Sequence, residues 1–91
     1  MHAVVVKVTI NSFETAQQML RDEVVPRASG APGFVAGYWT RAEDGNNGLS
    51  MVVFESEEAA RAASEMIRSQ AGQREDVTLD DIEVREVVAN A

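Results

Sequence analysis

Near the N-terminus, apolar and polar residues alternate with the period of a strand that buries one face. Between Ala3 and Ile10 one side carries only apolar residues, namely Val4, Val6, Val8 and Ile10. The spacing then changes to that of a helix, whose apolar positions are Phe13, Ala16, Leu20 and Val24. Asn11 or Ser12 can cap this helix, and Pro26 is expected to end or kink it near Val25.

A second helix is predicted in the other half of the chain. Ser56 is its expected N-cap, because two glutamates follow in the first turn, where the helix dipole favours acidic groups. This alanine-rich helix should continue to about Gln70 and stop at Gly72. Clusters of turn-forming residues separate further strands. A turn is expected at 29–33, strands at 34–41, 49–55 and about 81–88, and a hairpin loop at 43–48.

The resulting order is strand, helix, strand, strand, helix, strand. It predicts an α+β fold, the ferredoxin-like β-α-β-β-α-β sandwich, in which a four-stranded antiparallel sheet carries both helices on one face. We expect the first and last strands to lie side by side at the sheet centre, with even-numbered apolar residues under the helices, Val88 among them. Their odd-numbered face mixes Val5, Thr9 and Val87 with Lys7, Glu83 and Arg85, which is typical of a lined cavity between two packed sheets.

Composition narrows the function classes. The 91 residues form one predicted domain, 1–91, and pairing with a second copy would help a core of this size. The absence of cysteine excludes disulfides, zinc-thiolate sites and thiol nucleophiles. The formal net charge of −7 argues against nucleic acid as a partner. No apolar run approaches the ~18 residues of a membrane span, and the N-terminus lacks the pattern of a signal peptide, so we expect a cytoplasmic protein without a membrane partner.

Few residues are suited to catalysis or to metal binding. The single histidine, His2, stands at the start of the first strand. Members of the acidic pairs are adjacent in sequence and should point in different directions, so we interpret all three as surface and expect no metal site. These pairs are Glu57-Glu58, Glu75-Asp76 and Asp80-Asp81. No Walker loop, dinucleotide fingerprint or Ser-His-Asp arrangement is present.

Two segments carry a family resemblance: Ala31-Pro32-Gly33-Phe34-Val35-Ala36-Gly37-Tyr38-Trp39 and Val52-Val53-Phe54-Glu55-Ser56-Glu57-Glu58-Ala59-Ala60. With the element order, they resemble the dimeric α+β barrel superfamily, in particular its antibiotic-biosynthesis-monooxygenase-like branch. The resemblance implies a homodimer closed through the open sheet faces, with a pocket between sheet and helices in each subunit. Some members oxidise polycyclic phenols without a cofactor and others degrade haem. The resemblance places an Asn near the end of the first strand, which Asn11 matches loosely, and a Trp where Phe54 stands here.

Four residues are candidates for binding a substrate: Lys7, Asn11, Trp39 and Arg41. Trp39 and Arg41 share one face of their strand, so they could stack on a planar ligand and steady its phenolate oxygen, or serve as interface aromatic and rim cation. Tyr38 should point to the opposite face, together with Phe34. Lys7 could lower the pKa of a bound phenol or pair with Glu83. Asn11 could bind a ligand or cap the helix.

Two functions stay open at this point. One is a cofactor-independent monooxygenase acting on an electron-rich aromatic small molecule, for which no cofactor is expected. The alternative is a non-catalytic, small-molecule-binding or stress-associated dimeric barrel protein, which the lack of a convincing general base favours.

Overall fold

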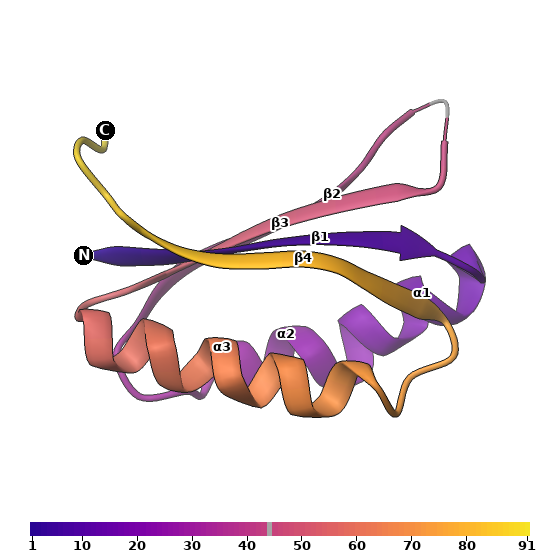
Figure 1. Ribbon diagram of the computed structural model, residues 1–91, viewed down its shortest axis with the longest axis horizontal. Coiled ribbons are helices and arrows are strands. Elements are labelled where there is room, and N and C mark those ends of the chain that lie inside the picture. The colour runs from indigo at the N-terminus through magenta and orange to yellow at the C-terminus, as the bar shows by residue number, and fades with distance from the viewer. Residues whose placement is uncertain (44) are drawn as a thin grey trace.

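The computed structural model describes residues 1–43 and 45–91, and it shows a four-stranded antiparallel sheet with all helices on one face (Figure 1). The expected hairpin loop includes Asp44, which lies outside the described residues. The elements are β1 (His2–Ile10), α1 (Phe13–Met19), η1 (Leu20–Val24), α2 (Val25–Ser29), β2 (Phe34–Arg41), β3 (Asn47–Phe54), α3 (Glu57–Ala71) and β4 (Val77–Glu86). The ferredoxin-like fold predicted from the order of the elements is confirmed.

The strand order is β2-β3-β1-β4. The first and last strands are neighbours, as predicted, but the central pair is β1 and β3, so the expectation that β4 is central is wrong. Both central strands are hydrogen-bonded on two sides, and Val4 of β1 is fully buried. The even-numbered residues of β1 pack under the helices as expected, in a core that also contains Val52, Phe54, Ala60 and Ile82.

The last strand begins and ends earlier than predicted. It starts at Val77, and its pairing with β1 shifts between Lys7 and Val8, where Asp80 is the extra residue. This bulge explains the error, because one inserted residue breaks the alternation that the sequence pattern relies on. Val88 lies beyond the strand and is exposed, so its expected place under the helices is wrong.

A second bulge lies at the start of β2. Phe34 pairs with Phe54 and Ala36 with Val53, which leaves Val35 as the extra residue. Phe34 therefore packs against the core on the helix face, edge-to-face with Phe54. Tyr38 pairs with Met51 on the other face, so the prediction that Tyr38 and Phe34 share a face is wrong.

Pro26 does not end the first helical segment. The N–H of Val25 donates to the carbonyl of Leu20, five residues earlier, which makes η1 a π-helical turn directly before the proline. Because Pro26 has no N–H to donate, the wider turn lets the chain continue into α2, which is capped at Gly30. Ser56 caps α3 as predicted, since its hydroxyl accepts a hydrogen bond from the N–H of Ala59 at 3.1 Å. No helix in the described part of the chain is long and apolar enough to cross a membrane.

Candidate functional site

A groove of about 320 Å³ lies between the sheet and the helices. Its floor is the helix face of the sheet, including Val6, Val8 and Val52, and its walls come from the α1-η1-α2 segment on one side and α3 on the other. Figure 1 shows these two helical segments in one layer beneath the same face of the sheet. The groove is therefore enclosed by elements from both halves of the chain.

Alanines explain why this space stays hollow. Both walls present small side chains to the groove, and these are Ala16, Ala28, Ala31, Ala59, Ala62, Ala63 and Ala71. A side chain of one carbon cannot reach across the space between two helices, so a cavity remains where larger residues would pack. The α3 residues that line the groove extend from Ala59 to Ala71, which is about 18 Å at the rise of an α-helix. An elongated site results.

Trp39, which lies in β2, contributes an aromatic side chain to the lining of this groove. It lies on the helix face and packs against the core cluster. Gly37 makes room for it, because a Cβ at position 37 would lie 2.7 Å from the Cη2 atom of the Trp39 ring. The ring is thus held over a glycine and contributes an apolar surface suited to a planar ligand.

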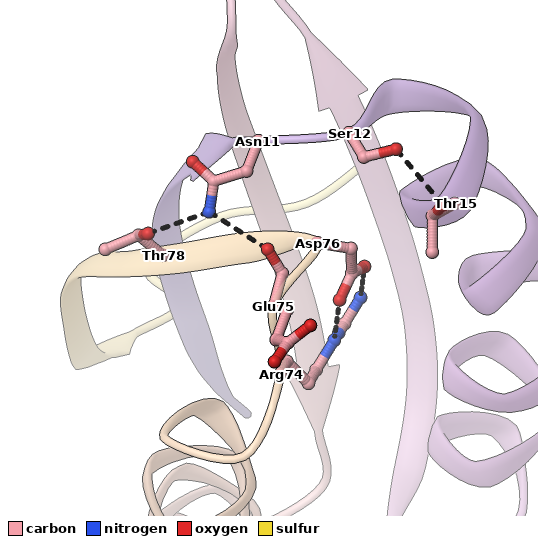
Figure 2. Close-up of polar contacts among 7 residues, drawn as sticks. All are labelled: Asn11, Ser12, Thr15, Arg74, Glu75, Asp76 and Thr78. Carbon is pink, nitrogen blue, oxygen red and sulfur yellow. Dashed lines mark hydrogen bonds and ion pairs between the residues drawn. The ribbon is translucent and has the colours of Figure 1, made fainter.

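The charged side chains that line the groove are basic. Arg27 and Arg74 line it, and the described residues supply no carboxylate, imidazole or phenol to its walls. The Nε atom of Arg74 donates to Asp76 at 3.0 Å and its Nη2 atom donates to the other carboxylate oxygen, as Figure 2 shows. These hydrogen bonds and the positive charge lower the pKa of Asp76 against the opposing effect of burial.

Asp76 itself is 6% exposed, so its interpretation as a surface residue is wrong. A buried carboxylate is stable only when paired, and Arg74 provides that partner. The spacing Arg-x-Asp directly after the end of the predicted second helix is the feature of the sequence that could have indicated this ion pair. The pair orients the Arg74 guanidinium and leaves three of its five N–H donors free.

Asn11 ties the end of β1 to the segment that precedes β4. Its Nδ2 atom donates to the carbonyl of Glu75 at 3.2 Å and to Oγ1 of Thr78 at 3.0 Å (Figure 2). Its backbone N–H donates to the carbonyl of Asp76 at 2.7 Å. The expected helix cap is therefore wrong for Asn11, because its amide is used in this cross-link. Ser12 is the N-cap residue, but its hydroxyl bonds Thr15 and not the backbone.

Lys7 and Arg41 lie outside the groove. Lys7 is exposed on the open face of the sheet, opposite Asp81 and Leu49. The expected pair with Glu83 is wrong, because Glu83 pairs with Arg85 at 2.8 Å. The Arg41 guanidinium lies 3.7 Å from the centroid of the Phe13 ring, a cation–π contact that joins β2 to α1. Of the four candidate residues, the structure places Trp39 in the groove and the other three outside it, with Lys7 on the opposite face of the sheet.

The open face of the sheet is the second notable surface. Large apolar side chains are exposed along β2 and β3, with Tyr38 69%, Leu49 47% and Met51 45% accessible. Tyr38 and Met51 are direct cross-strand partners, so this apolar surface is continuous. Charged residues border it on β1 and β4, and they are Lys7, Asp81, Glu83 and Arg85. Among the residues that the structure describes, no helix covers this face (Figure 1).

The described residues contain no group of three or more side chains that could hold a metal ion. His2 lies away from the groove, with Nε2 3.7 Å from a carboxylate oxygen of Glu57.

Comparison with known proteins supports the fold, because solved structures are similar to this chain over nearly its whole length. No family model matches the sequence, and no curated protein matches it. A dimeric ferredoxin-like protein from an uncultured marine organism aligns with a TM-score of 0.64 and 11% identity, over 100% of this chain and 98% of its own. The haem degrader MhuD of Mycobacterium tuberculosis, solved with two haems in its active site, aligns with a TM-score of 0.52 and 26% identity, over 97% of this chain and 98% of its own. This chain shares the ferredoxin-like fold with both.

Proposed function

We propose that this protein binds an apolar small molecule with a planar ring in the groove between its sheet and its helices. The observation that carries the proposal is the groove itself, an elongated space of about 320 Å³ with apolar walls and Trp39 among them. Ligand sites of small molecules have this size and this mainly apolar lining. The lack of a carboxylate, imidazole or phenol among the described lining residues favours binding over catalysis, because proton abstraction needs a positioned base.

The test is a calorimetric titration with 2-naphthol, with the fluorescence of Trp39, the single tryptophan of the chain, as a second readout. We expect saturable heat and a change in emission. Ala63→Phe should abolish both, because it fills the groove from α3. Ser69→Phe is the matched control, since Ser69 is an exposed residue of the same helix and does not line the groove. Equal binding by the wild type and Ala63→Phe would refute the proposal.

We further propose that the open sheet face is covered by a second copy of this chain. Tyr38, Leu49 and Met51 are exposed side by side, and together they form an apolar patch and not scattered single residues. A contiguous patch of this kind marks a surface that a partner covers. Charges of both signs at its border suit a two-fold contact, in which Lys7 and Arg85 of one copy face acidic groups of the other. The dimeric state of the ferredoxin-like relative supports the same arrangement.

Sedimentation equilibrium over a range of protein concentrations tests this dimer. The wild type should have the mass of a dimer, and Met51→Lys should be monomeric because it places a charge in the apolar contact. Met66→Lys is the control, since Met66 is similarly exposed, 54%, but lies on the helix side. A monomeric wild type would leave the open face in water and refute the dimer.

The groove of this chain does not fit haem. Haem iron takes its axial ligand from histidine, cysteinate, tyrosinate or, paired with histidine, methionine. Met66 is the one such side chain among the described lining residues, and His2 does not line the groove. The likeness to MhuD therefore supports a shared fold and not a shared ligand.

A cofactor-free monooxygenase is the second candidate, and the apolar groove with Trp39 and the likeness to MhuD favour it. A phenol with a free para position would lose its proton, its anion would pass an electron to O₂, and quinone and water would form. One oxygen atom enters the ring and the other leaves as water. Oxygen uptake with a panel of hydroxylated polycyclic aromatics, lost in Trp39→Leu, would support it. No uptake with any of them would remove it.

A further inference from the structure

The charged residues that line the groove are positive, whereas the protein as a whole has a negative net charge. The chain has fifteen acidic and eight basic residues. The ionisable residues that line the groove are nevertheless two arginines, Arg27 and Arg74, with no aspartate or glutamate among the described lining residues. A groove that is apolar along its length and basic where it is charged is complementary to a ligand with an apolar body and an anionic group.

The two arginines differ in how much of their charge is free. Arg74 donates two hydrogen bonds to Asp76, so its charge is largely neutralised by a carboxylate that is itself buried. Arg27 comes from α2 on the opposite wall and makes no ion pair with any residue in the described part of the chain. Arg27 is therefore the lining cation with an uncompensated charge.

We infer that the natural ligand is an apolar acid whose carboxylate is bound by Arg27, while its hydrophobic body lies along α3 in the groove. This inference rests on the proposed binding function and adds the chemical class of the ligand. The planar guanidinium matches a carboxylate through two parallel hydrogen bonds. Arg74, oriented by Asp76, offers its remaining donors as polar contacts within the same lining.

The test compares two ligands of the same shape and different charge. Purified full-length protein is titrated by calorimetry with 2-naphthoate and with 2-naphthamide at pH 7 and low salt. The wild type should bind the acid about fivefold more tightly than the amide, the ratio expected for one charge-assisted contact with an exposed arginine. Arg27→Gln should bring the ratio of acid affinity to amide affinity to about one. Arg21→Gln is the control, since Arg21 is an exposed arginine of η1 that does not line the groove.

The outcomes separate the ligand class from the binding function. Equal affinities of the wild type for acid and amide, or a preference that survives in Arg27→Gln, would overturn the role of Arg27 while leaving the groove as a binding site. Binding of neither compound would overturn the binding function and this inference together. Far-ultraviolet circular dichroism of Arg27→Gln shows whether the variant is folded, and Arg21→Gln, which should keep the preference of the wild type, shows whether the effect is specific to Arg27.

Discussion

Replacing Asp76 by asparagine tests the buried ion pair beside the groove most directly. The substitution keeps the shape of the side chain and the backbone carbonyl, which accepts hydrogen bonds from Asn11 and Ser12. It removes the charge that two hydrogen bonds from Arg74 compensate. The change therefore isolates the electrostatic part of this contact.

The expected cost follows from the burial of both partners. Breaking a fully buried ion pair costs about 3–5 kcal/mol, because the remaining charge is stranded without a partner. The side chain of Arg74 is 24% exposed, so part of its guanidinium can be rehydrated, and the asparagine oxygen can still accept one hydrogen bond. We expect Asp76→Asn to lower the free energy of unfolding by about 2 kcal/mol.

The pH dependence gives a second, independent readout. Hydrogen bonding by Arg74 lowers the pKa of Asp76 in the folded protein below its ordinary value of 3.8, although burial opposes the shift. A group with a lowered folded pKa adds stability above its unfolded pKa and loses it as the pH falls through the folded value. The stability difference between wild type and Asp76→Asn should be constant between pH 5 and 7 and shrink below about pH 3.8.

Urea denaturation followed by far-ultraviolet circular dichroism measures both quantities, at one protein concentration so that association does not differ. Glu23→Gln is the matched control: it removes one negative charge from an exposed position of η1, away from the open sheet face, and should change stability by less than about 0.5 kcal/mol. The reasoning would be refuted if Asp76→Asn cost no more than this control. A difference that stayed the same from pH 7 to pH 3 would refute it equally.

Three further substitutions test how the site is held. Gly37→Ala should cost about 1–3 kcal/mol in urea denaturation and shift the emission of Trp39, because the added methyl displaces the ring; unchanged emission would contradict the packing. Ser56→Ala should cost about 1 kcal/mol through loss of the α3 cap, and Ser69→Ala, exposed on the same helix, should cost less than half of that. Asn11→Ala should cost about 1–2 kcal/mol by removing two hydrogen bonds, and an unaltered stability would show that the cross-link contributes nothing.

Much of the fold could be predicted because the local pattern and the tertiary structure agree. The alternation in β1 and the cap at Ser56 are local signals, and both elements form where they are expected. The errors in assigning residues to faces of the sheet arose where one residue is added to a strand. The bulges at Val35 and Asp80 reverse the faces of Phe34 and of the residues that begin β4, and a bulge is chosen by the neighbouring strand and not by the local sequence.

The candidate site could be predicted less well than the fold. Trp39 was found because a tryptophan in a strand is conspicuous, but Lys7, Asn11 and Arg41 stood out for polarity or position and lie outside the groove. Seven of the residues that line the groove are alanines, which carry no chemical signal in a sequence. Arg27 and Arg74 were not among the candidates, since a lone arginine on a helix or in a polar linker usually lies in solvent.

The sequence by itself determined the order of the elements, the apolar face of β1 and the scarcity of catalytic groups, because periodicity and composition are properties of the chain alone. Only the tertiary structure decided the central position of β3, the burial of Asp76 against Arg74 and the groove lined by Trp39 and Arg27. Each of these depends on segments far apart in sequence meeting in space. A cavity in particular is the space that small side chains on separate helices leave between them, and no local pattern records it.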